Sequence, residues 1–157
     1  MKTQTCCFTG HRNIPESESH NIQKRLEEEV AKLIRQGVRY FGAGGALGFD
    51  TMAALTVLKA REAHSHIRLI LVLPCKNQSA KWNESDKKTY NQILEQADKV
   101  VYTSESYHPH CMHVRNRHLV DHSSVCICCL TESKGGTKYT VDYAKKKDLR
   151  TINLADK

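Results

Sequence analysis

Short apolar runs alternate with longer amphipathic segments along the whole chain, and this alternation limits the possible folds more than any other feature. The run IRLILVLP at 67–74 is almost continuously apolar, as expected for a strand buried on both faces of a parallel sheet. The segment 19–36 instead carries apolar residues at helical spacing and ends at Gly37, which predicts an amphipathic helix. These apolar residues are Ile22, Leu26, Val30, Leu33 and Ile34.

The same reading extends over the rest of the chain. It predicts strands at 5–9, 38–43, 67–74, 99–103, 124–130 and 150–154, and helices at 19–36, 50–63, 84–97, 111–122 and up to about 147. Regular alternation of strands and helices predicts an α/β fold, an open and mostly parallel sheet of about six strands with helices on both faces. Ligands of such sheets bind beyond the carboxyl ends of the strands.

Composition narrows the class of protein and its partners. A chain of 157 residues fits one domain over 1–157 that buries about 70% of its unfolded surface. The net charge of +7 favours anionic partners such as nucleotides, phosphates or nucleic acid. The start MKTQTCCFTGHR lacks a signal peptide, and no apolar run reaches the length of a membrane span. We therefore expect a cytoplasmic location and no membrane partner.

The seven cysteines are interpreted as small buried residues. Their number is odd and they cluster in predicted strands, which is not the pattern of a disulfide framework. Cys126 and Cys129 formally make a CxxC motif. On a strand, however, residues three apart point to opposite faces and cannot share a metal ion without a bend, so redox or metal chemistry is only the alternative interpretation.

A cluster of glycines opens the predicted second helix. The stretch FGAGGALGFD at 41–50 contains Gly44, Gly45 and Gly48 and then Asp50, and it matches neither a Walker A motif nor G-x-G-x-x-G. Glycines allow backbone amides to approach an anion at a helix N-terminus, while tight packing is the alternative explanation. Asp50 is interpreted either as the N-cap of the helix or as a hydrogen-bond partner of a ribose hydroxyl.

Two other post-strand loops carry candidate phosphate-binding groups. Gly135, Gly136 and Thr137 repeat the glycine-rich opening at the start of another helix, so the two loops together predict a two-sided phosphate cradle. The loop after the first strand contributes Gly10, His11 and Arg12, and Arg12 is a candidate for a charge-assisted phosphate contact. We expect Gly45→Asp or Gly136→Asp to abolish ligand binding and to leave the fold intact.

The predicted helix near 111–122 carries the remaining candidate site residues. Met112, Leu119 and Val120 define its buried face, and Asn116 points inward with them. Arg115 and Arg117 lie on opposite flanks of that face, about 200° apart around the helix axis. At most one of the two is therefore expected to contact a given phosphate.

Histidines and aromatic residues add weaker signals. The stretch HPHCMH at 108–113 offers several metal-ligating side chains, but there is no HExxH motif and we predict no metal site. Trp82 and Tyr107 lie in post-strand loops, where they could stack on a base or pack as a lid on the core edge.

These motifs together resemble the SLOG superfamily, which groups DNA-processing (Smf, DprA-like) proteins with the Lonely Guy enzymes. The stretches that carry the resemblance are CCFTGHR, GAGGALGFD, LVLPC, MHVRNRHLVDHSS and GGTKYTVDYAKKK. They are most similar to the stand-alone YoqJ/YpsA-like branch, over residues 6 to about 152. The resemblance implies a Rossmann-like fold with a pocket for a nucleotide or nucleotide-derived ligand, and a homodimer or higher homo-oligomer.

The sequence departs from the enzymes of this superfamily at one informative position. Lonely Guy phosphoribohydrolases carry a glutamate where Thr140 stands, and a hydroxyl cannot replace a carboxylate in acid–base chemistry. We therefore expect a binding protein, a sensor or a sequestering protein for an NAD-like, ADP-ribose-like or cyclic nucleotide ligand, without a further cofactor. The alternatives are a hydrolase of an N-glycosidic or phosphoester bond, with Asp50 as substitute, and a DprA-like binder of single-stranded nucleic acid.

Overall fold

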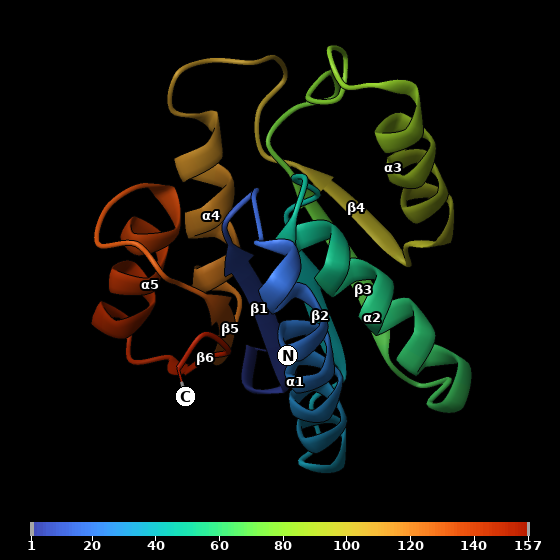
Figure 1. The fold of residues 1–157 in the computed structure, drawn as a ribbon, viewed down its shortest axis with the longest axis vertical. Coiled ribbons are helices and arrows are strands. Elements are labelled where there is room, and N and C mark those ends of the chain that lie inside the picture. The colour runs from blue at the N-terminus through green and yellow to red at the C-terminus, as the bar shows by residue number, and fades with distance from the viewer. Residues whose placement is uncertain (1, 157) are drawn as a thin grey trace.

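The computed structural model describes residues 2–156, in which one parallel sheet lies between two layers of helices (Figure 1). The strands are β1 (Thr5–Gly10), β2 (Tyr40–Ala43), β3 (Arg68–Leu73), β4 (Lys99–Tyr102), β5 (Val125–Cys129) and β6 (Arg150–Asn153). Their order across the sheet is β4-β3-β2-β1-β5-β6, and all neighbouring strands are parallel. The predicted six-stranded parallel α/β architecture is confirmed.

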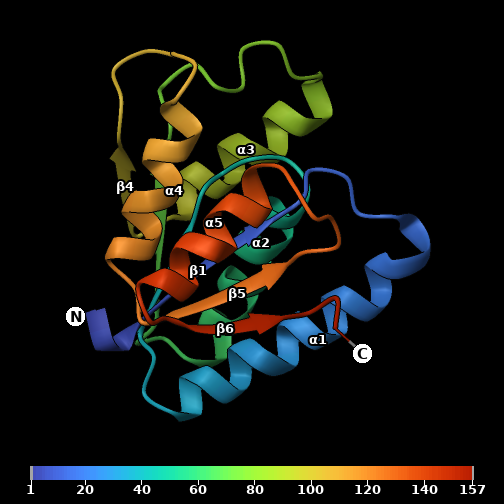
Figure 2. The same cartoon turned by 90° about the vertical axis from the view of Figure 1, so that its left-hand side faces the viewer.

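The helices lie on both faces of the sheet (Figures 1 and 2), and a separate hydrophobic cluster holds them on each face. One face is covered by α1 (Glu16–Arg35), α2 (Phe49–Ala63) and α3 (Glu84–Gln96). The other is covered by α4 (Cys111–Asp121) and α5 (Gly136–Lys146). A short 3-10 helix, η1 (Lys2–Gln4), precedes β1. Within the described residues, no helix has the length and apolar character needed to cross a bilayer.

The apolar stripe of α1 shows why the sequence folds in this way locally. All five apolar residues of the predicted stripe are buried against the sheet. The helix stops because Gly37 adopts a left-handed conformation with φ 99°, and the Val38 N–H donates to the carbonyl of Leu33. The helix begins at Glu16, three residues before the prediction, because the polar first turn gives no apolar signal.

The cysteines behave as buried apolar residues. All seven are buried and free. Along β5, Cys126 packs in the cluster under α4 and α5, whereas Cys129 packs in the cluster under α1 to α3. The prediction that these two side chains point to opposite faces is confirmed.

The strand order creates a switch point between β1 and β5. The chain runs from β1 to β2 on one side and, after β4, returns to place β5 on the other side of β1. The loops that follow β1 and β5 therefore diverge at the carboxyl edge of the sheet. This is the place where ligands bind in open α/β sheets.

Candidate functional site

A cavity of about 560 Å³ lies at this switch point, which we call the carboxyl-edge cavity. The loop after β1, the loop between β5 and α5, and the first halves of α4 and α5 form its walls, together with Ala46 and Asp50. Its volume falls within the range of small-molecule sites. The two loops that were predicted to make a phosphate cradle thus contribute to the same cavity.

Arg115, on α4, is the best-defined polar group of the wall. Its side chain is only 4% exposed, its Nη1 donates to the carbonyl of Gly44, and its Nε donates to Oδ1 of Asn116 at 2.6 Å. Its Nη2 has Sδ of Met112 at 3.5 Å, and a thioether is a weak acceptor. Because a guanidinium has five N–H donors, Arg115 keeps unused donor capacity at the cavity wall.

Asp50 is the buried carboxyl group beside Arg115. It is 6% exposed, and its Oδ2 accepts a hydrogen bond from the Ala46 N–H at 3.2 Å. Burial raises the pKa of Asp50, and the positive charge of Arg115 is the larger of two opposing effects. The N-cap of α2 is Gly48, so the interpretation of Asp50 as the N-cap is wrong. Its carboxyl group instead braces the turn before the helix.

The open start of α5 is another part of the wall. A Cβ added to Gly135 or Gly136 would meet no atom within 4 Å. The backbone of these two residues is therefore accessible from solvent and from the cavity. The first N–H groups of a helix have no partner within the helix, and the helix dipole adds partial positive charge there. This end of α5 can therefore accommodate an anion.

Charged side chains of both signs lie around the mouth. Arg12 and Lys134 line the cavity and are exposed, and Glu132 lies among them. His11 accepts a hydrogen bond on Nε2 from the Thr131 N–H at 3.1 Å. This bond places the proton of a neutral imidazole on Nδ1, which lies 3.7 Å from the carboxylate of Glu132.

Nine of the thirteen predicted site residues line the carboxyl-edge cavity. They are Gly10, His11, Arg12, Asp50, Arg115, Asn116, Gly135, Gly136 and Thr137. The other four, Gly44, Gly45, Gly48 and Arg117, are not among its lining residues. Of the two arginines on α4, Arg115 faces the cavity and Arg117 is exposed, as expected for side chains on opposite flanks of one helix.

The three glycines of the 44–48 loop are packed against the protein itself, which corrects the expectation that they face a ligand. A Cβ on Gly44 would lie 2.5 Å from Nη1 of Arg115 and 2.9 Å from Oδ2 of Asp50. A Cβ on Gly45 would collide with Leu73, and one on Gly48 with the backbone of Arg12. The prediction that Gly45→Asp leaves the fold intact is therefore contradicted by the space around that residue.

Several lining residues were missed as site candidates. Lys134 and Glu132 stand beside the predicted GGT motif, so their sequence neighbourhood was the available signal. Gln78 had no signal, because its loop reaches the cavity only through the fold; its Nε2 donates to Tyr90 Oη at 3.1 Å, while its buried Oε1 has no partner within the described residues. Trp82 and Tyr107, named as possible stacking groups, both line the cavity.

Thr140 is engaged in the helix itself. Its hydroxyl donates to the carbonyl of Gly136 at 2.8 Å, and the side chain is buried. The hydroxyl at this position is therefore bonded back to the first turn of α5. Thr140 is not among the residues that line the cavity.

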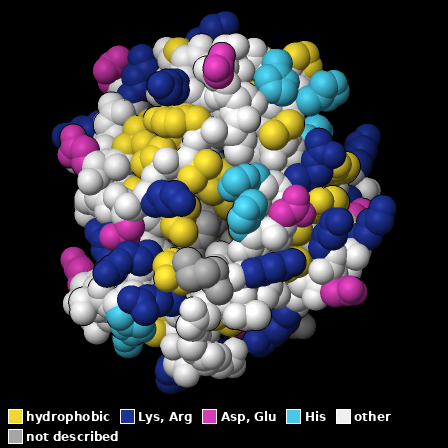
Figure 3. Space-filling view, turned by 180° about the vertical axis from the view of Figure 1, so that it is seen from behind, with side chains coloured by type: hydrophobic (Ala, Val, Ile, Leu, Met, Phe, Trp, Pro, Cys, Tyr) yellow, Lys and Arg dark blue, Asp and Glu magenta, His cyan; other side chains and the backbone are white. Residues whose placement is uncertain are grey.

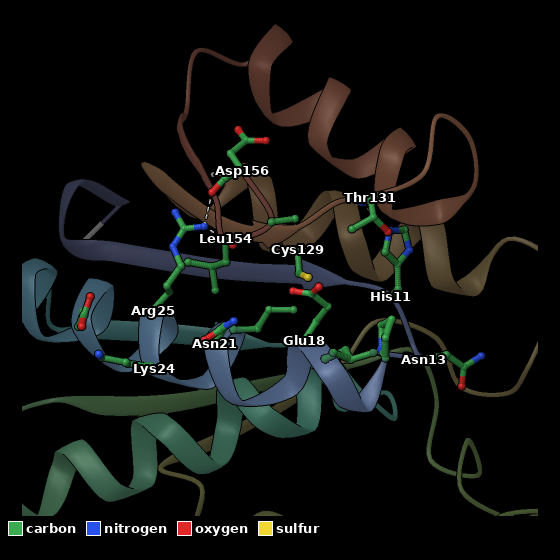
Figure 4. A pocket seen from close by; sticks show the side chains of 15 residues that line it. His11, Asn13, Glu18, Asn21, Lys24, Arg25, Cys129, Thr131, Leu154 and Asp156 are labelled. Carbon is green, nitrogen blue, oxygen red and sulfur yellow. Dashed lines mark hydrogen bonds between the residues drawn. The ribbon is translucent and has the colours of Figure 1, made fainter.

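A second cavity of about 770 Å³ lies between α1 and the carboxyl ends of β5 and β6 (Figure 4). It shares His11 with the first cavity, and Cys129 and Leu154 form part of its floor. Arg25 donates from Nη1 to the carbonyls of Leu154 and Asp156, at the end of the cavity near β6. The other charged residues that line this second cavity are Glu18, Lys24, Glu28 and Asp156. Because three of these four are acidic, the set does not favour an anion.

An open parallel sheet with a cavity at its central switch point defines a Rossmann-like α/β protein. The chain belongs to the YspA SLOG family, whose model matches residues 6–155. It is 35% identical to a UPF0398 protein of Halalkalibacterium halodurans over 153 residues, 88% of this chain and 81% of the relative. It is 30% identical to the SPβ prophage-derived protein YoqJ of Bacillus subtilis over 138 residues, 80% of this chain and 81% of YoqJ.

Two solved structures share the fold. The chain superposes on DNA processing protein A of Streptococcus pneumoniae with a TM-score of 0.68 at 15% identity, covering 96% of this chain and 50% of that one. For DNA processing protein A of Helicobacter pylori, whose structure is described in terms of single-stranded DNA binding, the TM-score is 0.65 at 22% identity. There the superposition covers 96% of this chain and 64% of the other. This chain thus spans half to two thirds of those proteins.

Proposed function

We propose that the protein binds a phosphate-bearing, nucleotide-derived small molecule in the carboxyl-edge cavity. The observation that supports this proposal is a pair of anion-binding features in the lining of one cavity. Arg115 presents unused guanidinium donors from a buried position, and the bare backbone at Gly135 and Gly136 opens α5. A phosphate between the two would receive charge-assisted hydrogen bonds from both sides.

The rest of the cavity suits the other parts of a nucleotide. Trp82 and Tyr107 line it and offer aromatic surface for a base. We propose that Asp50, which lines the cavity, accepts a hydrogen bond from a ribose hydroxyl. Because Thr140 is bonded to the helix backbone, we propose binding without turnover, as in a sensor or a sequestering protein.

A matched pair of variants at Gly136 tests this proposal. Gly136→Asp and Gly136→Asn add side chains of the same size in open space, but only Asp adds negative charge. An acidic residue in the first helical turn stabilises a helix by about 0.3–1 kcal/mol, so Gly136→Asp should unfold at the same or a slightly higher temperature. Its affinity for an anion in the cavity should nevertheless fall.

The measurement is a thermal-shift and calorimetric panel of NAD, ADP-ribose, cyclic ADP-ribose isomers and cyclic dinucleotides, with mass spectrometry of small molecules that co-purify. We expect at least one compound to bind the wild type, Gly136→Asn to bind within about threefold, and Gly136→Asp to lose about tenfold or more, which is about 1.4 kcal/mol. Equal affinities of the two variants would place the phosphate elsewhere. Conversion of the compound would favour a hydrolase.

A second candidate function is binding of single-stranded DNA at the same edge. It is favoured by the shared fold with DNA processing protein A of Helicobacter pylori and by the exposed Tyr107, since bases stack on aromatic side chains. Anisotropy with a labelled oligothymidylate separates the two functions. Binding of the oligonucleotide that is weakened by Gly136→Asp, without binding of any small compound, would replace the first proposal.

A further inference from the structure

The opposite edge of the sheet, where the strands begin, carries an unusual excess of positive charge. Five of the six strands start at a lysine or arginine or within three residues after one. The last turns of α1 and α5 end at the same edge with further basic residues. We call this set the basic rim: Lys2, Arg35, Arg39, Arg68, Lys99, Lys145, Lys146, Lys147 and Arg150.

Backbone hydrogen bonds place the starts of neighbouring strands side by side in one row. The N–H of Arg39 donates to the carbonyl of Gln4, and the N–H of Arg68 donates to the carbonyl of Arg39. At the other end, the Arg150 guanidinium donates to the side chain of Gln36, directly after α1. Six strands spaced by about 4.8 Å span about 24 Å, so the row is long enough to follow an extended polyanion.

The rim has few carboxylates to balance it. None of the nine basic side chains makes an ion pair within residues 2–156, whereas Arg61 nearby is paired with Asp98 at 2.7 Å. The other acidic residues at this edge are Glu62, Glu95, Asp121 and Asp148, and Asp121 accepts a hydrogen bond from Tyr143. In the lower half of Figure 3, Lys and Arg side chains outnumber Asp and Glu.

Helix dipoles explain only part of this pattern. Basic residues in the last turn stabilise a helix through its negative end, which accounts for Arg35 and for Lys145 to Lys147. The residues at the strand starts, such as Arg39, Arg68 and Lys99, belong to no helix. Unpaired like charges on one edge repel each other, so this arrangement costs stability unless an anion neutralises it.

We propose that the basic rim binds the phosphate backbone of duplex nucleic acid, independently of the carboxyl-edge cavity. One feature favours a duplex over a single strand. The four large apolar side chains exposed in the described chain, Leu55, Tyr102, Tyr107 and Tyr139, lie outside the rim, so the rim offers no such platform for unstacked bases. Its contacts are lysines and arginines, which bind phosphates without reading sequence.

The test compares two triple variants with the same change in net charge. Arg39→Gln, Lys99→Gln and Lys146→Gln remove rim charges before β2, at the start of β4 and at the end of α5, at exposed side chains without a hydrogen bond to another part of residues 2–156. Lys24→Gln, Lys81→Gln and Lys88→Gln remove three exposed charges from α1, from the loop after β3 and from the first half of α3, away from the rim. The probe is a labelled 24-base-pair DNA duplex, measured by anisotropy between 25 and 200 mM NaCl, with a labelled 24-nucleotide oligothymidylate alongside.

If the rim contacts about five phosphates, log K for the duplex should fall against log salt with a slope of about −4.5. The rim triple variant should bind the duplex about tenfold or more weakly at 50 mM NaCl, and its salt slope should be less steep by about 3. The affinity of the control variant should stay within about threefold of the wild type. Equal losses in both variants, no duplex binding by the wild type, or tighter binding of the oligothymidylate would overturn the proposal. Because Gly136→Asp lies at the other edge, it should leave duplex binding unchanged even if the cavity proposal fails.

Discussion

Two glycine-rich loops open helices at the same edge of the sheet, and they lack side chains for opposite reasons. In the loop before α2, the space that a side chain at Gly44, Gly45 or Gly48 would occupy is filled by other parts of the protein. In the loop before α5, the space beside Gly135 and Gly136 is empty. The first loop is therefore part of the core, while the second is available to a ligand.

A glycine cluster in a sequence indicates that another group lies close to the backbone. It does not show whether that group is a ligand or another part of the protein. Arg115 covers Gly44 and donates to its carbonyl, and the backbone of Arg12 covers Gly48. The first loop thus acts on the cavity indirectly, because it lets a buried guanidinium and the loop after β1 come close together. Substitutions in the first loop should change folding stability, and those in the second should change binding.

The largest expected effect is that of Gly48→Ala. The residue has φ 78°, and an added Cβ would collide with the carbonyl of Arg12, a backbone group that cannot rotate away. Left-handed strain and overpacking together should lower the free energy of unfolding by at least about 3 kcal/mol, measured by urea denaturation. Gly37→Ala is the control, since its φ is 99° and no atom lies within 4 Å; similar losses in both would show that the collision is irrelevant.

Arg115→Met should have the next largest effect, about 2 kcal/mol at pH 7.5, because it leaves the buried carboxyl group of Asp50 without its positive neighbour. The loss should depend on pH. Removing Arg115 raises the pKa of Asp50 further above its unfolded value, so the folded state binds more protons and stability falls as pH rises.

Urea denaturation at pH 4.5 and 7.5 checks the sign of this dependence. The deficit of Arg115→Met relative to the wild type should be larger at pH 7.5. The added substitution Asp50→Asn should remove most of the difference between the two pH values. A deficit that is constant with pH would mean that Arg115 acts mainly through its hydrogen bond to Gly44.

The smallest effect is expected for Gly135→Ala, in the loop before α5, where the space beside the glycines is empty. The residue has φ 104°, and an added Cβ would meet no atom within 4 Å. Only the left-handed strain remains, so the free energy of unfolding should fall by about 1 kcal/mol. A loss as large as that of Gly48→Ala would mean that the second loop is packed against the protein and is not open.

The sequence predicted the sheet and most of the cavity because both depend on local patterns. Apolar runs such as 67–74 report burial on both faces, and the carboxyl ends of parallel strands necessarily share an edge. From that rule, the sequence predicted that Gly10, Asp50 and Gly136 lie at one site. It did not reveal Gln78, because a single polar residue in a long loop has no periodic pattern to mark it. Self-association stays a prediction, which a measurement of mass in solution would test.

By itself, the sequence determined the parallel α/β order, the burial of the cysteines and the family, since each follows from residue types and their spacing along the chain. Only the tertiary structure decided which glycines are open and which arginine faces the cavity. Those answers depend on contacts such as Arg115 with Gly44, which lie 71 residues apart. The space beside a residue is filled by neighbours in the fold, and spacing along the chain does not specify them.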